Sequence, residues 1–321
     1  MNKLIKEFIK SVIPKKILRN IQKKIDLKKQ EKVSKYWDKV LENYFQNKGI
    51  ELNIKAKKTE IENNKVIWQF WAQGWAYDKL PDIVKLSYKS IEKNKGDYTV
   101  IRLDENTMFD YLEFPEYIVE KLRNKQILYT HFSDLLRLGL LYNYGGVWLD
   151  ATVYLSDILP EEYTKYQYFI YQREDNVTSE EKEKYNNLDF TYFSWDKNHK
   201  VNMLSSIMFS KKNNDILKIL MYGLLYFWKE NDKVRHYYIF QILYDNLMKK
   251  YYSEKRCIIV SDILPHKLNF ILLEEYNEKN LKKLLKEISI HKLNFKLVYS
   301  KENIKGTVLE YLFTEEKIEG E

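Results

Sequence analysis

Apolar positions alternate between strand-like and helix-like spacing from residue 66 onward. Short apolar runs of strand length occur at residues 66–71, 98–103, 147–150, 168–172, 205–209 and 257–260. Apolar side chains at intervals of three and four residues, typical of helices that bury one face, occur at residues 82–94, 128–144, 215–228 and 237–249. The alternation predicts an α/β domain whose sheet carries helices on its faces.

The first part of the chain has a different pattern. Apolar residues recur at helical spacing on both sides of Pro14, which predicts two short amphipathic helices. Another helical stretch is predicted at about residues 31–47, and the polar segment 55–65 is the predicted linker. We therefore divide the chain into a basic amphipathic helical region, residues 1–54, and a main domain, residues 55–321.

Positive charge is concentrated at the N-terminal end. The chain has a net charge of +8, and residues 1–35 carry twelve Lys and Arg residues against three acidic ones, a net of +9. A basic amphipathic helix lies readily in the interface of an anionic bilayer, where each nearby cation contributes about 1 kcal/mol. The alternative is a solvated helix that packs its apolar stripe on the rest of the protein. The stretch lacks the interleaved aromatic residues of a nucleic-acid stacking surface, so we expect no nucleic-acid partner.

Other features of the sequence indicate the compartment. No apolar run reaches the roughly 18 residues that a membrane-spanning helix needs. Lysines interrupt the apolar residues of the N-terminal segment, so the uninterrupted core of a signal peptide is missing. A single cysteine, Cys257, allows neither an intramolecular disulfide nor a thiolate zinc site. We expect a cytoplasmic protein, held peripherally on the inner face of the cytoplasmic membrane by its N-terminal helices.

Charged residues in one predicted helix and in the strand after it form the main candidate site. Asp134 and Arg137 lie where their helix becomes apolar on all sides, so their charges must be paired or bound to a ligand. By themselves they are also compatible with a plain salt bridge between residues i and i+3. Gly145 and Gly146 then let the helix end and the chain enter a buried strand. Asp150 ends this strand, at the edge where α/β sheets bind ligands.

Asp150 has two interpretations on its own. Its carboxylate is suited to hold a hard cation against a diphosphate. An aspartate that caps a turn with Thr152 is equally compatible with the local sequence. The spacing of the aspartate and arginine pair, the two glycines and this aspartate is more specific than any of its parts.

The combined pattern resembles the signature of bacterial capsular polysaccharide synthesis glycosyltransferases. The matching residues are Ser133-Asp134-Leu135-Leu136-Arg137 and Tyr144-Gly145-Gly146-Val147-Trp148-Leu149-Asp150-Ala151-Thr152. These enzymes are related to the mannosyltransferases of glycosyltransferase family 32, and the layout is similar to the catalytic domain of the large clostridial glucosylating toxins. Residues 66–71 with Gly74 and Pro81 resemble their first strand, and His291-Lys292-Leu293 resembles a short late motif of the capsular group. The resemblance covers about residues 65–296.

This resemblance implies a fold and an activity. The fold would be of the GT-A type, Rossmann-like, for residues 55–321. The enzyme would move a sugar, most simply a hexose, from a UDP- or GDP-sugar onto a growing capsular or lipopolysaccharide-type glycan or a lipid-linked oligosaccharide. By analogy with its relatives it would retain the anomeric configuration. It would use a divalent metal, Mn²⁺ or Mg²⁺.

The resemblance also implies roles for residues that would bind the donor. Phe70 and Trp71 would border the nucleotide base. Asp134 and Arg137 would act in catalysis and bind sugar and ribose hydroxyl groups. The remaining donor-binding positions would be Gly145, Gly146 and Lys292, of which Lys292 would meet the diphosphate.

The implied metal ligands depart from the usual DXD motif. Asp150 would be the leading aspartate, and Thr152 occupies the second acidic position. Because a hydroxyl is a weaker ligand than a carboxylate for a hard cation, we expect weaker metal binding than two aspartates would give. His291 would complete the metal shell, although a structural role for a lone histidine remains equally open.

Two other functions remain open on the sequence. A phosphotransferase or phosphatase with a nucleophilic aspartate would need a second aspartate two residues after Asp150, where Thr152 stands. A non-catalytic, membrane-docked scaffold would leave Asp134, Arg137 and Asp150 without an explanation. Slow hydrolysis of a nucleotide sugar would distinguish a glycosyltransferase from both.

Overall fold

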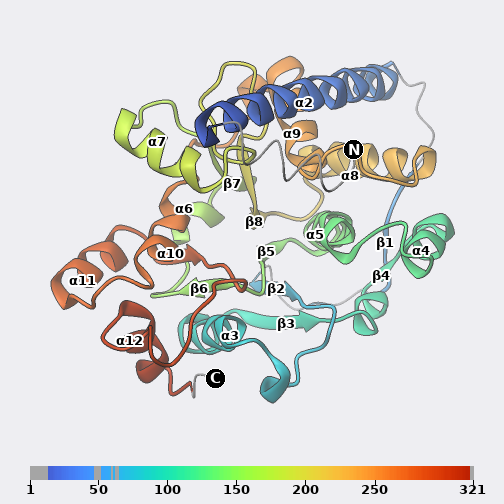
Figure 1. Cartoon of the computed structure of the whole chain (residues 1–321). Coiled ribbons are helices and arrows are strands. Elements are labelled where there is room, and N and C mark those ends of the chain that lie inside the picture. The colour runs from blue at the N-terminus through green and yellow to red at the C-terminus, as the bar shows by residue number, and fades with distance from the viewer. Residues whose placement is uncertain (1–13, 47–51, 59–60, 62–64, 319–321) are drawn as a thin grey trace. The chain divides into compact units, whose positions relative to one another are not determined.

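The computed structural model describes residues 14–46, 52–58, 61 and 65–318 (Figure 1). Backbone contacts divide the chain into two compact units. The first unit contains residues 1–50, 175–202 and 233–256, and the second contains residues 51–174, 203–232 and 257–321. The predicted division lies between residues 54 and 55, and the structure has a unit boundary between residues 50 and 51. The first unit also includes residues 175–202 and 233–256, so it is not one continuous stretch of the sequence.

The second unit is built on a five-stranded mixed sheet. The strand order is β3 (Thr99–Leu103), β2 (Val66–Phe70), β5 (Gly146–Leu149), β8 (Met203–Ser210) and β7 (Tyr168–Gln172). β3, β2 and β5 are parallel, and β8 is antiparallel to both of its neighbours. The carboxyl ends of β3, β2, β5 and β7 therefore share one edge of the sheet. All residues of β2, β5 and β7 are buried, as expected for strands covered on both faces.

Helices of the second unit pack around this sheet. They are α3 (Asp82–Asn94), α4 (Glu116–Arg123), α5 (Tyr129–Tyr144), α6 (Glu161–Thr164), α8 (Asp215–Glu230), α10 (Lys267–Ile271), α11 (Glu278–Glu287) and α12 (Val308–Glu315). α5 packs against α8 and against β2, β5 and β8. Short 3₁₀ helices occur at Tyr77–Lys79, Thr107–Asp110 and Leu264–His266. The predicted α/β class is confirmed.

Two small antiparallel sheets complete the second unit. β1 (Lys55–Ala56) pairs with β4 (Leu112–Glu113), and β6 (Val153–Leu155) pairs with β9 (Ile290–Lys292). The second pair brings a late segment of the chain beside the residues that follow β5. A carboxyl-terminal core formed by Leu268, Leu281 and Leu309 packs with Tyr154 of β6 and so supports this pairing.

The first unit is formed by the long helix α2 (Lys15–Phe45) with α7 (Ser179–Leu188), α9 (Ile239–Lys250) and the 3₁₀ helix Ser253–Lys255. α2 lies along α9. Trp37 is fully buried, and its indole N–H donates to the carbonyl of Ile239 at 3.0 Å. Ser34 donates to Asn246 at 2.9 Å. The second half of α2 is therefore part of the core of this unit.

Two predicted elements differ from the structure. The helices predicted after Pro14 and at residues 31–47 are one continuous helix, α2, because no glycine or proline interrupts residues 15–45. The segment 257–260 forms no strand in the described chain, since Ile258 and Ile259 are exposed and the bridge to β7 is made by the next residue, Ser261, with Gln172. The amphipathic helix predicted before Pro14 lies outside the described residues.

No helix in the described ranges combines the length and the apolar character that crossing a bilayer requires.

Candidate functional site

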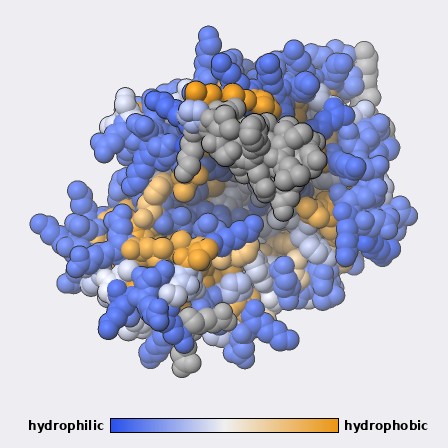
Figure 2. All heavy atoms as spheres, viewed as in Figure 1, coloured by the Kyte–Doolittle hydropathy of each residue, from blue (hydrophilic) through white to orange (hydrophobic). Residues whose placement is uncertain are grey.

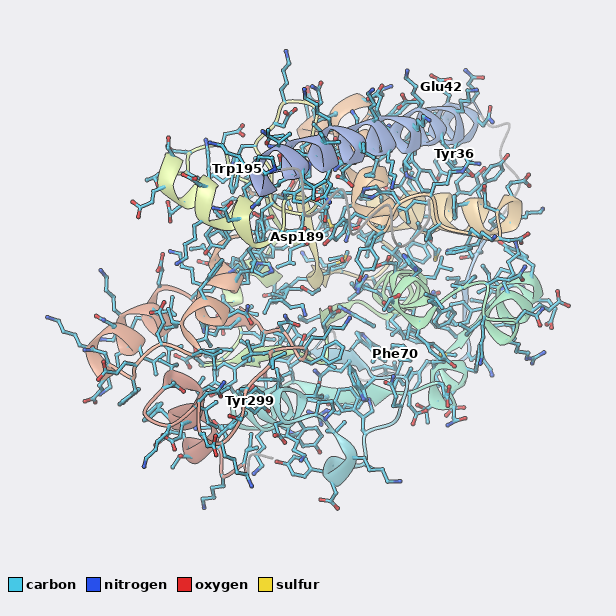
Figure 3. All side chains as sticks on the ribbon, in the orientation of Figure 1. Tyr36, Glu42, Phe70, Asp189, Trp195 and Tyr299 are labelled. Atoms are coloured by element: carbon cyan, nitrogen blue, oxygen red, sulfur yellow. The ribbon has the colours of Figure 1, made fainter. Side chains whose placement is uncertain are left out.

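The candidate site lies in the second unit, at the carboxyl ends of β2 and β5. Phe70 is the last residue of β2, and Asp150 directly follows β5. Because Trp68 pairs with Trp148 in the parallel register, Phe70 and Asp150 lie abreast at the edge of the sheet. Trp71 packs against a small cluster that includes Ala151. The structure thus brings the predicted base-binding aromatic residues beside the predicted metal-binding aspartate (Phe70 is labelled in Figure 3).

Arg137 connects helix α5 to the end of β5. One terminal nitrogen of its guanidinium donates to Asp134, one helical turn earlier, and the other donates to Asp150 Oδ1 at 3.2 Å. Its side chain is only 3% exposed. The Nε–H of Arg137 is buried and has no partner among the described residues. The three charged residues predicted from the sequence therefore form one network, and its arginine keeps a donor for a further acceptor.

Trp148 is part of this network and was not among the predicted site residues. Its indole N–H donates to Asp150 Oδ1 at 2.8 Å, and the Arg137 guanidinium lies 4.7 Å from the centre of its ring. The sequence could have identified Trp148, because side chains alternate along a strand and residues 148 and 150 therefore lie on the same face. Trp148 orients both the carboxylate and the guanidinium.

The two carboxylates of the network differ in their pKa. Burial raises the pKa of Asp134 to about 6, although the charge and hydrogen bond of Arg137 act in the opposite direction. Burial acts in the same way on Asp150, but there the charges of Arg137 and Lys292 and the hydrogen bond of Trp148 prevail, so that its pKa is lowered. Asp150 is therefore the carboxylate that remains ionised over the wider pH range.

Lys292 reaches this network from a strand 140 residues later in the chain. In the β6–β9 pair it lies opposite Val153, and the N–H of Leu293 donates to the carbonyl of Thr152 at 2.9 Å. The Lys292 ammonium donates to Thr152 Oγ1 at 2.5 Å and lies 3.9 Å from Asp150 Oδ2. Lys292, predicted to bind the donor, thus meets Asp150 and Thr152, two of the three predicted metal ligands.

His291 lies away from these residues. It precedes Lys292 in β9, so its side chain points to the opposite face of the strand. It is fully buried, its Nε2 shares a hydrogen bond of 3.0 Å with Ser156 Oγ, and its ring packs near Tyr154. The structure does not bring His291 to Asp150 and Thr152, and we leave it out of the proposed metal site. Its surroundings are those of a core histidine.

Gly145 and Gly146 lie at the other end of β5 from Asp150. Over the length of this strand they are separated from the site by about 13 Å. Gly146 has a φ of 95°, and a Cβ at this position would lie 2.5 Å from the carbonyl oxygen of Val66. The prediction that these glycines bind the donor is therefore not supported by their placement. They let helix α5 end and strand β5 pack closely on β2.

A comparison with models of protein families matches residues 16–312 to the family described as capsular polysaccharide synthesis protein. The chain belongs to this family.

Two relatives of this chain are similar to it over shorter stretches. The O-glycosyltransferase PaGT of Phomopsis amygdali is 23% identical over 186 residues, which are 55% of this chain and 41% of the relative. The O-glycosyltransferase braB of Annulohypoxylon truncatum is 31% identical over 104 residues, which are 30% of this chain and 24% of the relative. The chain spans less than half the length of either relative. A solved structure titled PaToxG Glycosyltransferase aligns over 91% of this chain and 96% of its own, with 14% identity and a TM-score of 0.33.

A divalent cation in this family member would have Asp150 and Thr152 as its protein ligands. Among the described residues, no group of three or more His, Cys, Asp and Glu side chains is arranged to hold a metal ion. Asp150 Oδ1 already accepts two hydrogen bonds, so the ligand oxygens would be Asp150 Oδ2 and Thr152 Oγ1, and Thr152 Oγ1 accepts from Lys292 in this structure. One carboxylate and one hydroxyl fit a hard cation that takes its other ligands from a diphosphate and water.

Several residues at the same edge of the sheet had no signal in the sequence. The exposed ring of Phe295 meets Trp71 edge-on at 5.5 Å. The N–H of Asp150 donates to the carbonyl of Ser206, whose hydroxyl is buried without a partner in the described part of the chain. Arg173, just after β7, makes a buried, bidentate ion pair with Asp262. Phe295 and Ser206 reach the site from distant parts of the sequence.

The buried histidine of this family member makes a prediction about stability and pH. Burial lowers the pKa of His291 to about 3, so between pH 3 and about 6.5 the unfolded chain binds a proton at this position and the folded chain does not. The free energy of unfolding should therefore fall as the pH falls, by about 2 kcal/mol from this residue alone at pH 5. His291→Gln should reduce the loss of melting temperature between pH 7.5 and pH 5, measured by calorimetry. Equal losses in parent and variant would contradict the assignment of His291 to the core.

Proposed function

We propose that this protein is a glycosyltransferase that moves a hexose from a UDP- or GDP-sugar to a hydroxyl group of a growing capsular or lipopolysaccharide-type glycan, with retention. The observation that carries the proposal is the network of Asp134, Arg137, Asp150 and Lys292 at the carboxyl ends of β2 and β5. An α/β sheet binds nucleotides at this edge, and two cations there suit a diphosphate. Membership of the capsular family and the O-glycosyltransferase names of the relatives support it.

The residues of the network have complementary parts in this reaction. When the bond between the anomeric carbon and the diphosphate breaks, negative charge develops on the departing diphosphate. Arg137 donates to Asp150 Oδ1 and Lys292 lies 3.9 Å from Asp150 Oδ2, so both cations are available beside Asp150 to donate to the diphosphate, and the Nε–H of Arg137 has no partner within the described chain. Preorganised cations in a partly buried site stabilise such charge strongly. A divalent cation held by Asp150 and Thr152 would add Lewis-acid neutralisation of the same group.

Aromatic side chains beside the network suit the base of the donor. Phe70 ends β2 next to Asp150, and Trp71 and Phe295 form an edge-on pair at the same end of the strand. A ring stacked on a nucleobase contributes about 1–3 kcal/mol without selecting one base. We propose that Phe70 and Trp71 border the base and that Asp134 and Arg137 bind hydroxyl groups of the sugar and ribose.

The proposed function is tested by incubating the protein with individual UDP- and GDP-sugars and Mn²⁺ or Mg²⁺. A glycosyltransferase slowly releases free sugar and nucleoside diphosphate from its own donor, even without an acceptor. Release of phosphate from phosphoesters would instead favour an aspartate-dependent phosphotransferase. Turnover of neither class of compound would favour a scaffold.

We also propose that the first half of α2 holds the protein on the anionic inner face of the cytoplasmic membrane, where a lipid-linked acceptor would be located. Ile17, Ile21 and Ile25 follow one another at intervals of four residues and are 51%, 44% and 49% exposed. Figure 2 shows an apolar strip among hydrophilic side chains over the first turns of α2, at the top of the view. Lys16 and Lys24 of the same turns are exposed. An exposed apolar ridge beside cations suits an anionic lipid surface.

The ridge can be tested without disturbing the buried half of α2. The triple change Ile17→Gln, Ile21→Gln and Ile25→Gln removes apolar surface from an exposed helix face, so binding to vesicles with anionic lipids should weaken by at least about tenfold. Cosedimentation with vesicles at low and high salt measures this, and binding of the parent should weaken with salt.

A matched control changes two other exposed isoleucines, Ile258→Gln and Ile259→Gln, which are outside α2. This control should bind vesicles like the parent. Deletion of residues 1–54 is a poorer test, because it also removes Trp37 and Leu41 from the core of the first unit. Unchanged vesicle binding of the triple variant would contradict the proposed membrane contact.

A further inference from the structure

The two oxygens proposed as metal ligands already have a cation beside them. The Lys292 ammonium donates to Thr152 Oγ1 at 2.5 Å and to the carbonyl of Leu293 at 3.2 Å, and it lies 3.9 Å from Asp150 Oδ2. We propose that the Lys292 ammonium occupies the cation position at Asp150 and Thr152. The ammonium has to move away from these two oxygens before a divalent metal can bind them. The inference rests on the proposed function and concerns how its metal site is filled.

The position of Lys292 follows from backbone pairing. β9 is held against β6 by the pairs of Val153 with Lys292 and Leu155 with Ile290, and the N–H of Leu293 bonds to the carbonyl of Thr152. The stem of Lys292 is confined, since only 22% of its side chain is exposed. The pairing of β9 with β6 therefore positions the ammonium beside Thr152, unlike the ammonium of a lysine that is free to move on the surface.

The charges around Asp150 explain why the Lys292 ammonium and a divalent metal ion would exclude each other. Asp134 and Asp150 face Arg137 and Lys292, so the carboxylates and the cations of the network balance. A divalent cation added alone would leave excess positive charge in a partly buried site, and it would lie within a few ångströms of the ammonium. A diphosphate that arrives with the metal restores the balance. It also offers new oxygen acceptors to Lys292, so that the metal and the donor should bind together.

Titration with Mn²⁺ alone, without any nucleotide, tests this competition. Lys292→Met removes the charge and keeps the apolar stem, so it should bind Mn²⁺ at least about tenfold more tightly than the parent, measured by electron paramagnetic resonance of free Mn²⁺. Lys292→Gln, which can still donate to Thr152, should also bind more tightly. Lys292→Arg keeps the charge and should stay as weak as the parent.

The matched control is Lys296→Met, which removes an exposed lysine four residues later and should leave Mn²⁺ affinity unchanged. Melting curves select the folded variants, and two neutral replacements keep the test available if one of them fails to fold. Equal Mn²⁺ affinity in the parent and in a folded neutral variant would overturn the inference. So would Lys292→Arg binding as tightly as Lys292→Met. Failure of the proposed function would appear separately, as absence of nucleotide-sugar hydrolysis by the parent.

Discussion

Asp150→Asn should lower the hydrolysis of the nucleotide-sugar donor by at least about a hundredfold. The substitution removes the negative charge that Lys292 faces and that a divalent cation would need. It keeps an oxygen that can accept from Trp148 and from Arg137, and Arg137 retains its bond to Asp134. The melting temperature should therefore change by no more than about 3 °C, which corresponds to about 2 kcal/mol in a chain of this size. Turnover under saturating donor and a thermal melt measure the two effects.

A matched control for Asp150 is Asp157, an exposed aspartate a few residues later whose carboxylate caps the N–H of Ile158. Asp157→Asn makes the same chemical change outside the network and should keep the turnover of the parent. If Asp150→Asn hydrolysed the donor nearly as fast as this control, Asp150 would not be the residue at which the leaving group is neutralised.

Arg137→Lys should weaken binding of the donor by about ten- to a hundredfold, which corresponds to the loss of one charge-assisted hydrogen bond. The guanidinium reaches Asp134 and Asp150 at the same time and lies over Trp148, and it has one further N–H available within the described chain. A lysine supplies one point charge without this planar fork. The variant keeps a cation beside Asp134, so the loss of stability should be smaller than the loss of donor affinity. Calorimetric titration with the donor and a thermal melt compare the two.

Arg102 offers the matched control for Arg137. It is also a largely buried arginine, donates to Gln69 and Glu92, and lies over the ring of Tyr88. Arg102→Lys should lower the melting temperature and leave donor affinity unchanged. If Arg137→Lys behaved in the same way as this control, Asp134 and Arg137 would form a structural bridge and would have no part in donor binding.

The parts of the fold that follow local patterns were predicted with few errors. The helix predicted at residues 82–94 and the strand predicted at residues 168–172 have these bounds in the structure. Their apolar spacing repeats with the period of the backbone itself, so neighbouring residues are sufficient to specify them. The strand predicted at residues 257–260 failed for a tertiary reason, because the chain bridges to β7 at Ser261, after this segment, and leaves Ile258 and Ile259 exposed.

Sequence alone determined the centre of the candidate site. Asp134, Arg137 and Asp150 lie on one helix and on the strand that directly follows it, so a turn at Gly145 is enough to bring them together. Tertiary structure decided the placement of Lys292 and His291, which only the family resemblance had assigned to the site. Lys292 meets Thr152 across 140 residues because β6 and β9 pair, and the alternation along β9 then turns His291 into the core. A pairing between distant strands depends on the packing of the whole domain, and no pattern confined to either strand records it.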